Sequence, residues 1–153
     1  MEETHQFRVV AWWSSGRTGI AKSNSAPNAV HFTAPPQFGG LEGRWTPEDL
    51  LLSAVAGCFT TTFQTIAEYS KFEYTDLEVR AEAKVSKAEK GYAIAEIVIR
   101  PRLTITSEEL RDRALHLLDK TKALCLVSRA LAVTPKLEPR VEVGSALPVG
   151  AAL

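Results

Sequence analysis

Residues 46–67 read TPEDLLLSAVAGCFTTTFQTIA, and this stretch decides how the rest of the chain is interpreted. Thr46 is a favourable N-cap, and Pro47 suits the first helical position because the N–H that it lacks has no partner there. The two acidic residues that follow complement the positive end of a helix. From Leu50 to Ala67 there is no charged residue, and every face of a helix would be apolar, small or hydroxylic. We therefore predict a long central helix that the rest of the protein encloses.

Before this helix the sequence predicts strands and loops. Phe7–Trp13 is rich in residues that favour strands, and the glycines and serines of Ser14–Gly19 indicate a turn. A second short strand is predicted at Asn28–Thr33. The segment Ala34–Gly43 contains two prolines and three glycines, which predicts a long loop. Loops of this length in compact domains are often functional.

After the helix the pattern changes to alternation. In Tyr74–Lys87 apolar and charged residues alternate strictly, which indicates a half-exposed strand. Tyr92–Ile105 alternates less cleanly and predicts its partner, with Ala88–Gly91 as the hairpin turn. The order of elements predicts an α+β domain with an antiparallel sheet.

The last third predicts a second helix and a short final strand. Thr106 and Glu109 fit a capping box at the start of that helix. Cys125–Ala132 is either a separate short helix or its continuation, and Val141–Val143 is a candidate strand. We expect one domain over residues 1–153, with 144–153 as a loose tail. One apolar stripe is expected on the second helix, formed by Leu110, Ala114, Leu117, Leu118 and Leu124.

Composition narrows the function classes. The 153 residues carry 18 acidic and 18 basic side chains, so no global field favours nucleic acid or an anionic membrane. The N-terminus lacks the pattern of a signal peptide, and the uncharged central stretch contains too many hydroxyl groups for a membrane span. Two cysteines without an export signal indicate reduced thiols in the cytoplasm. We expect no nucleic acid, membrane or metal partner.

The two cysteines are Cys58, inside the central helix, and Cys125, after the second helix. Both have a simple interpretation as small buried apolar residues. A reactive thiol must instead be ionised, and Cys58 lies far from the start of its own helix, so we expect a cation beside it. The candidates are Arg17, in a glycine-flanked turn, and Arg44. Glu48 or Asp49 would pair with that arginine.

Helix geometry restricts this arrangement. Glu48 precedes Cys58 by ten residues, which is about 15 Å along a straight helix. One arginine that contacts both groups would require either two subunits or a Glu48 that lies before the regular helix. We favour the first alternative, which predicts a homodimer with shared sites.

At these residues the chain resembles a known family. The stretch from Thr46 to Phe59, with its helix start, small residues and Cys-Phe pair, is similar to the central-helix motif of the osmotically inducible and organic hydroperoxide resistance proteins, the OsmC/Ohr family. Cys125–Leu131 resembles that family's second cysteine motif, with Leu126 where proline is common. Ser15–Gly19 resembles the arginine loop of its organic hydroperoxide branch.

The resemblance implies an intertwined homodimer in which an antiparallel sheet wraps around a long buried central helix. It also implies peroxidase chemistry: Cys58 would be oxidised by an organic hydroperoxide to a sulfenic acid, and Cys125 would then form a disulfide with it. Arg17 would stabilise the thiolate and Glu48 would orient the arginine. The family implies no bound cofactor and an external dithiol, such as a dihydrolipoyl protein, as reductant. An apolar substrate would suit the aromatic residues Phe38, Trp45, Phe59 and Phe63, whose simpler role is core packing.

Two alternatives remain open from the sequence. A long helix with an acidic residue near its start, beside an antiparallel sheet, also resembles the hot-dog thioesterases, which do not need Cys125. A redox-sensing or ligand-binding dimer would keep the cysteines without turnover. The cysteines distinguish these classes, because only the peroxidase needs both thiols in a catalytic cycle.

Overall fold

A computed structural model describes residues 3–144 of the chain. The chain divides into two compact units, Met1–Leu51 and Leu52–Leu153. The predicted tail, 144–153, lies outside the described residues except for Gly144, whose N–H donates to the carbonyl oxygen of Ile105 at 3.1 Å.

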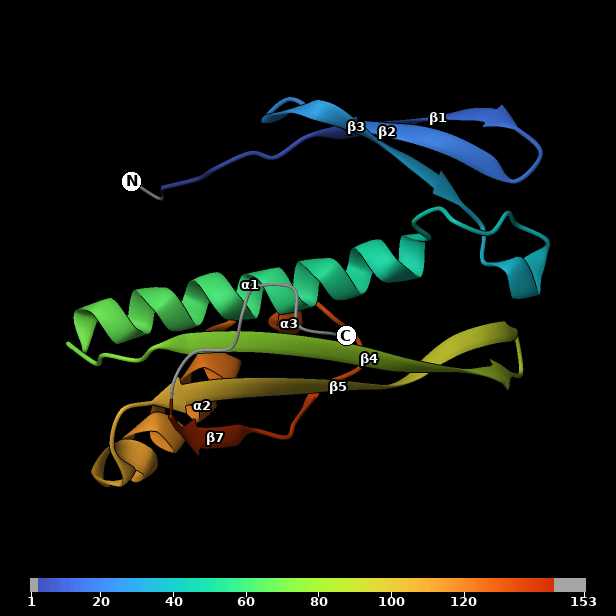
Figure 1. The fold of residues 1–153 in the computed structure, drawn as a ribbon. Helices are drawn as coiled ribbons and strands as arrows, with labels where there is room; N and C mark the ends of the chain where they lie inside the picture. Colours follow the sequence, from blue (N-terminus) through green and yellow to red (C-terminus); the bar gives the residue numbers. More distant parts are fainter. Residues whose placement is uncertain (1–2, 145–153) are drawn as a thin grey trace. The chain divides into compact units, whose positions relative to one another are not determined.

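The first unit contains a three-stranded antiparallel sheet in the order β1 (Val9–Ser15), β2 (Thr18–Ser23) and β3 (Ala26–Thr33) (Figure 1). The sequence predicted β1 and β3 but missed β2. The reason is that the predicted turn is confined to two residues, Gly16 and Arg17. Gly16 has φ 51°, a left-handed conformation that glycine adopts without steric cost, so the chain reverses at once.

A long loop follows β3 and leads to the central helix. It contains a single 3-10 turn, η1 (Pro36–Phe38). The loop is held closed by Thr33, whose hydroxyl accepts a hydrogen bond from the N–H of Leu41 at 2.8 Å. A side chain at Gly40 would place its Cβ 1.6 Å from the carbonyl oxygen of Ala34, so only glycine fits there. The Thr33 N–H also donates to the carbonyl oxygen of Trp45 at 2.9 Å, which ties the end of β3 to the residues just before the helix.

Helix α1 (Pro47–Tyr69) begins where the sequence predicts and extends two residues past Ala67, the end of the uncharged run. The Thr46 hydroxyl accepts the N–H of Asp49 at 3.1 Å, and the Asp49 carboxylate accepts the N–H of Thr46 at 2.9 Å. This is a reciprocal capping box, which satisfies two helix-end donors.

The expectation that α1 is enclosed on all sides is wrong for the single chain. One face is buried, through Val55, Phe59, Phe63, Ile66 and Ala67. The opposite face is exposed because it carries small and hydroxylic residues: Ser53, Ala54, Gly57, Thr60, Thr61, Gln64 and Thr65. By length and composition α1 could cross a membrane, but its large apolar side chains pack inside the protein.

The second unit is built on a long hairpin of β4 (Asp76–Ala88) and β5 (Gly91–Ile105), which are antiparallel. Two short strands, β6 (Lys136–Leu137) and β7 (Arg140–Val143), pair with β5 in the parallel direction. The antiparallel sheet predicted from the sequence is confirmed by the long hairpin, and the parallel pairing is confined to this edge. The chain reaches it through two helices after β5, and such a crossover brings a strand back parallel.

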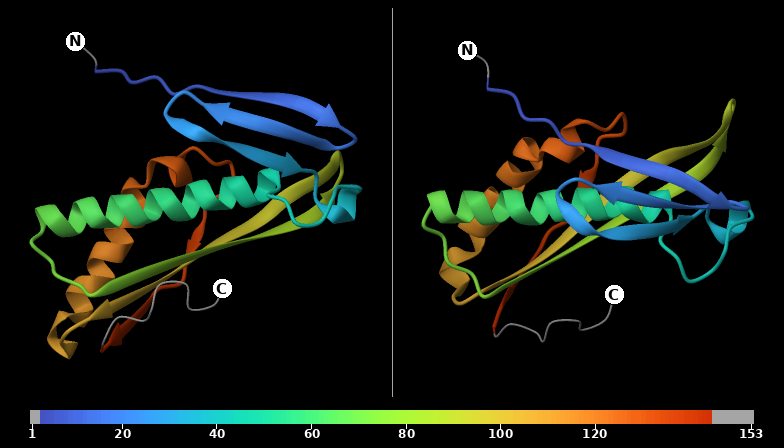
Figure 2. Two further views of the ribbon diagram at one scale, coloured as in Figure 1. Left: turned by 45° about the horizontal axis from the view of Figure 1, so that its top comes forward. Right: turned by 90° about the horizontal axis from the view of Figure 1, so that it is seen from above.

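Those helices are α2 (Arg111–Leu124) and α3 (Leu126–Arg129), after a 3-10 turn η2 (Glu108–Leu110). The predicted capping box at Thr106 is corrected by one residue, because Ser107 accepts the N–H of Glu109. Figure 2 shows α2 crossing the direction of α1.

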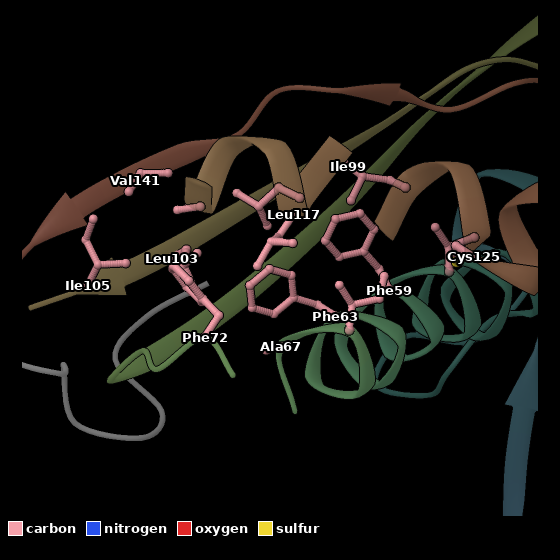
Figure 3. Close-up of a cluster of buried hydrophobic side chains, with 14 residues drawn as sticks. Phe59, Phe63, Ala67, Phe72, Ile99, Leu103, Ile105, Leu117, Cys125 and Val141 are labelled. Atoms are coloured by element: carbon pink, nitrogen blue, oxygen red, sulfur yellow. The ribbon is translucent and has the colours of Figure 1, made fainter. Parts of the chain in front are cut away.

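The core of the second unit lies among α1, α2 and the sheet (Figure 3). Phe59 and Phe63 of α1, Leu118 of α2, and Leu103 of β5 are fully buried. Leu124, expected in the apolar stripe of α2, is instead half exposed at the end of the helix, and Thr121 is buried in the stripe. Cys125 belongs to this same core.

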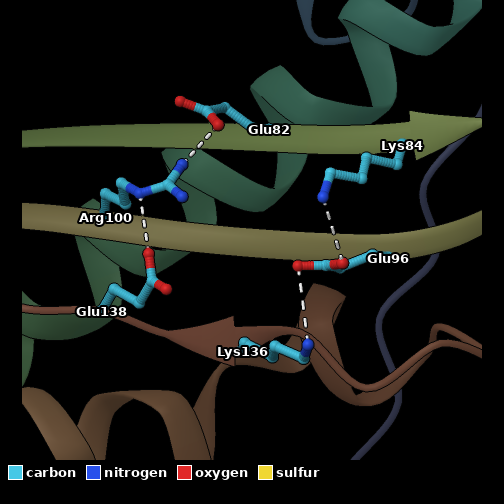
Figure 4. A network of polar contacts seen from close by, with 6 residues as sticks. All are labelled: Glu82, Lys84, Glu96, Arg100, Lys136 and Glu138. Carbon is cyan, nitrogen blue, oxygen red and sulfur yellow. Dashed lines mark hydrogen bonds and ion pairs between the residues drawn. The ribbon is translucent and has the colours of Figure 1, made fainter.

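The sheet also carries a network of ion pairs, shown in Figure 4. Arg100 pairs with Glu82 and with Glu138, and Glu96 pairs with Lys84 and Lys136. These pairs connect β4, β5 and the segment that holds β6. Exposed pairs of this kind contribute little stability individually, about 0–1 kcal/mol, so their main effect is to keep this face of the sheet polar.

Candidate functional site

Two cysteines that are 67 positions apart in the sequence meet in the second unit. Cys58 lies in the middle of α1 and is half-buried, whereas Cys125 is fully buried between α2 and α3. Their side chains are within hydrogen-bonding reach of each other, and both thiols are free. Forming a disulfide between them would require an oxidant to remove two electrons and two protons, with the sulfurs brought to about 2.05 Å.

The backbone at Cys125 explains how this meeting arises. Cys125 is extended, with φ −63° and ψ 112°, so α2 ends there and α3 starts as a separate short helix. This resolves the alternative that the sequence left open. The Cys125 N–H still donates to the Thr121 carbonyl oxygen at 2.9 Å, and its carbonyl oxygen accepts the N–H of Arg129 at 3.1 Å. Both main-chain polar groups of Cys125 are therefore hydrogen-bonded at the break. The first N–H groups of α3 remain available to another acceptor.

That acceptor is the sulfur of Cys58. Burial raises the pKa of Cys58, but hydrogen bonds from the Val127 N–H, the Cys125 thiol, the Thr62 hydroxyl and the Leu126 N–H outweigh it. The net effect is a pKa below the ordinary value of 9.0. The Thr62 hydroxyl lies one helical turn away, 3.8 Å from the Cys58 sulfur. Donors that favour the charged form of a thiol make it more reactive.

Cys125 is shifted in the opposite direction. Burial raises the pKa of Cys125, and the neighbouring Cys58 raises it further. Hydrogen bonds from Ser128 oppose this effect; the Ser128 hydroxyl donates to the Cys125 sulfur at 3.3 Å. The pair thus consists of one thiol biased toward the thiolate and one biased toward the neutral form. Such a separation suits a nucleophile and a partner that reacts after it.

Sequence reasoning missed these donors. It expected a side-chain cation for Cys58, and the structure supplies backbone N–H groups and a hydroxyl. Backbone groups leave no signal in a sequence, because almost every residue has an N–H. Ser128 and Thr62 had a weak signal, since each lies three or four residues from a cysteine and so shares its side of a helix.

Arg17, the predicted cation, lies in the β1–β2 turn of the first unit. Its guanidinium donates to the carbonyl oxygen of Phe38. A Cβ at Gly39 would lie 2.8 Å from Arg17 Nη1, so glycine at that position makes room for the arginine. Arg17 is also tied to β3, because its carbonyl oxygen accepts the N–H of Ala34 at 2.9 Å.

Glu48, the predicted partner of that cation, stands in the first turn of α1. Helix α1 begins at Pro47, so the alternative in which Glu48 precedes the regular helix is wrong. One carboxylate oxygen of Glu48 is buried and has no hydrogen-bond partner among the described residues. A buried carboxylate oxygen is costly unless a donor reaches it. The competing cation, Arg44, is exposed in the loop before α1. The roles of Arg17, Glu48 and Arg44 toward Cys58 remain predictions.

The four aromatic residues divide into two groups. Phe59 and Phe63 are fully buried, so for them the core-packing role is confirmed. Trp45 is half exposed and Phe38 is partly buried in the loop beside Arg17. In residues 3–144 there is no group of three or more His, Cys, Asp or Glu side chains arranged to hold a metal ion.

Comparison with known proteins identifies the family. The family model described as OsmC-like protein matches residues 40–140, which is most of the chain. The chain therefore belongs to the OsmC-like family, as the cysteine motifs predicted.

The individual curated relatives share only low sequence identity with this chain. The chain is 26% identical over 145 residues to the uncharacterized protein YmaD of Bacillus subtilis, covering 92% of this chain and 97% of that one. It is 23% identical over 116 residues to peroxiredoxin OsmC of Escherichia coli, covering 76% and 80%.

Among solved structures, an organic hydroperoxide resistance protein from Elizabethkingia anophelis matches with a TM-score of 0.75. The match has 20% identity and covers 94% of this chain and all of that one. OhrB of Bacillus subtilis matches with a TM-score of 0.65 and 20% identity over 92% of this chain and 98% of that one. At this identity the structural matches establish the fold, and the predicted α+β class is confirmed.

Proposed function

We propose that this protein is a thiol peroxidase that reduces organic hydroperoxides to alcohols. The observation that carries the proposal is the pair of free cysteines in contact, with the more exposed sulfur of Cys58 biased toward the thiolate. The names of the relatives, a peroxiredoxin and organic hydroperoxide resistance proteins, support the same chemistry.

The cycle has three balanced steps. The Cys58 thiolate attacks the distal oxygen of ROOH, the O–O bond breaks, and the alkoxide leaves as an alcohol after taking a proton. Cys58 is then a sulfenic acid. The Cys125 sulfur attacks the Cys58 sulfur, an S–S bond forms, and the hydroxyl of the sulfenic acid leaves as water. An external dithiol finally supplies two electrons and two protons and returns both cysteines to thiols.

Arg17 and Glu48 are assigned supporting roles. In this proposal the Arg17 guanidinium binds the peroxide and stabilises negative charge on the oxygen that leaves, while Glu48 orients the guanidinium. The buried, unpartnered carboxylate oxygen of Glu48 is consistent with a missing cationic donor.

We further propose that the active form is a homodimer with shared sites. Glu48 and Cys58 lie ten residues apart on one regular helix, about 15 Å, so an arginine that serves both joins two chains. The exposed face of α1 and the large apolar residues exposed on β1 are surfaces that a second copy would cover. The cytoplasm, where a dithiol reductant is available, is the expected compartment.

The substrate and the reductant follow from the surroundings of Cys58. Its sulfur packs against the apolar core beside Val127, which suits an apolar peroxide substituent better than hydrogen peroxide. A dihydrolipoyl group, an apolar dithiol, is the expected reductant.

The test is stopped-flow oxidation of the reduced protein with cumene hydroperoxide and, separately, with hydrogen peroxide, followed by intact mass. We expect faster reaction with cumene hydroperoxide and loss of two mass units as the disulfide forms, as removal of two hydrogens requires. Cys58→Ser abolishes peroxide consumption, whereas Cys125→Ser permits one oxidation and then stops without a disulfide. Full multi-turnover activity in Cys58→Ser would exclude this mechanism.

The other functions give different results. Acyl-CoA hydrolysis that is insensitive to thiol alkylation would support a thioesterase with Glu48 as its carboxylate. Oxidation of the thiols without turnover by any dithiol would support a sensor.

A further inference from the structure

Ser128 is a buried hydroxyl beside one sulfur of the cysteine pair. Its residue is only 6% exposed, and its hydroxyl donates to the Cys125 sulfur at 3.3 Å. It lies on α3, three residues after Cys125, so the start of the short helix fixes both groups together. Cys125 itself has no exposed surface. Among the described residues, Ser128 supplies the side-chain hydrogen bond that this sulfur accepts, whereas toward Cys58 the Cys125 thiol is the donor.

The exposure of the two sulfurs decides how a reductant can attack their disulfide. Cys58 is half-buried, whereas Cys125 is enclosed by the core (Figure 3). An external thiolate therefore reaches the Cys58 sulfur, and Cys125 becomes the leaving group. The rate of thiol–disulfide exchange depends on how well the leaving thiolate is stabilised. This is one of two points in the cycle at which the buried sulfur must carry a negative charge, the other being its attack on the sulfenic acid of Cys58.

We propose that Ser128 is the hydrogen-bond donor that stabilises the Cys125 thiolate when a dithiol reductant attacks the Cys58 sulfur. This inference rests on the proposed peroxidase cycle and specifies its reductive half. The raised pKa of Cys125, caused first by burial, supports it, because an unfavourable leaving group gains most from a donor.

Reduction of the Cys58–Cys125 disulfide proceeds by two successive thiol–disulfide exchanges. One sulfur of the dithiol, as a thiolate, forms a bond to the Cys58 sulfur, and the Cys58–Cys125 bond breaks with its electron pair on Cys125. The Cys125 thiolate, held by Ser128, takes up a proton. The second sulfur of the reductant then attacks the first, forms the oxidised cyclic disulfide, and releases Cys58 as a thiolate.

The experiment measures reduction of a disulfide that is already formed. The full-length protein is oxidised with diamide, so the test does not depend on peroxide, and is reduced with dihydrolipoamide in a stopped-flow instrument. We expect Ser128→Ala to lower the rate constant of reduction by roughly three- to tenfold more than that of peroxide oxidation, as loss of a hydrogen bond to a charged leaving group predicts.

Thr121→Val is the matched control. Thr121 is a fully buried hydroxyl that donates to the carbonyl oxygen of Leu117 at 2.7 Å, so this variant removes a core hydroxyl that does not contact a sulfur. The ratio of the two rate constants should stay within about twofold of the wild-type ratio, as expected of a structural change alone. Equal effects of the two variants on this ratio would overturn the proposal.

A second experiment measures the pKa of Cys125 by titration. In the Cys58→Ser background, the thiolate absorbance of Cys125 is titrated with and without Ser128. Loss of the donor should move the midpoint to higher pH, and an unmoved midpoint would contradict the assignment.

The site of attack is tested in the wild-type protein and does not require Ser128→Ala to fold. The preformed disulfide is treated with 2-mercaptoethanol, quenched with acid and mapped by peptide mass. An adduct on Cys58 supports the proposal and an adduct on Cys125 overturns it. If the wild-type disulfide is reduced normally but peroxide never forms it, the peroxidase function fails instead.

Discussion

The two units of the chain differ in how far their large apolar side chains are exposed. The second unit buries Phe59, Phe63 and Cys125 completely, in a core that also fixes the sulfur pair. The first unit leaves β1 exposed along its whole length, with Trp13 at 77% exposure, and Phe7, which precedes the strand, at 87%. The second unit therefore contains the thiols with their hydrogen-bond donors, while the first presents an arginine and uncovered apolar surface. The groups that shift the pKa of the two thiols therefore lie within the second unit.

The largest difference between the units is expected in stability. Phe63→Ala removes a fully buried ring that stacks edge-on with Tyr74 at 5.2 Å between centroids, and should lower the free energy of unfolding by about 3–5 kcal/mol. Phe7→Ala removes the same ring from an exposed position and should cost less than about 0.5 kcal/mol. Urea unfolding of both variants measures the difference.

The same pair also tests whether a second copy covers the first unit. If Phe7→Ala costs more than about 1 kcal/mol, and the cost depends on protein concentration, Phe7 is buried in an assembly. An equal cost for both variants at all concentrations would contradict the contrast between the units.

The next effect concerns the cation. Arg17→Ala should lower the rate of peroxide reduction by about 10- to 100-fold, because one charge-assisted contact in a transition state is worth about 1.5–3 kcal/mol. Arg44→Ala is the control and should change the rate by less than about threefold, since an exposed charge acts weakly. Stopped-flow oxidation by cumene hydroperoxide measures both, and the reverse order would reassign the cation to Arg44.

A mixed dimer tests which chain supplies the arginine to each site. Chains with Arg17→Ala and chains with Cys58→Ser are co-expressed with different tags and purified as heterodimers. If the site is shared, one complete site forms per dimer, and activity returns to about half of the wild-type value by this count of sites. Activity of about half that of the Arg17→Ala homodimer, by the same count of sites, would place both groups in one chain.

A smaller effect is expected from Thr62, which belongs to the second unit. Its hydroxyl helps to hold the pKa of Cys58 below 9.0, against the effect of burial. The thiolate, and with it the rate of alkylation by iodoacetamide, should therefore reach half of its maximum below pH 9.0. Thr62→Val should move this profile to higher pH and slow alkylation at neutral pH by about two- to fivefold, the effect of one weak hydrogen bond.

The matching profile for Cys125 has the opposite sign. Burial raises the pKa of Cys125, so in Cys58→Ser the remaining thiol should reach half of its maximal reactivity above pH 9.0. Profiles that coincide for the two cysteines would remove the division of roles between them.

The sequence predicted the helices and strands that carry their own local signals. The bounds of α1 follow from Thr46, Pro47 and the uncharged run after them. By contrast, β2 was missed because Thr18–Ser23 has little apolar character and follows a glycine turn. The parallel pairing of β6 and β7 could not be predicted, because strands of two and four residues carry too little pattern to fix their direction.

The candidate site shows the same limit. Its cysteines were found from their neighbours in the sequence, and the fold brings them together. The main-chain donors to Cys58 were missed because their positions depend on the break at Cys125, where the chain leaves the helical conformation without a proline. A sequence records side chains, whereas this part of the site depends on the direction of main-chain N–H groups.

Because the helix breaks at Cys125, the main-chain N–H of Leu126, and not its side chain, contributes to the site. In the motif that the chain otherwise resembles, proline commonly follows this cysteine, and proline has no N–H to donate. Leu126 keeps the N–H, and this group is one of those that favour the charged form of Cys58. The exchange of one apolar residue for another thus adds a main-chain donor, and we expect the protein to stay active in more acidic surroundings than a Leu126→Pro variant.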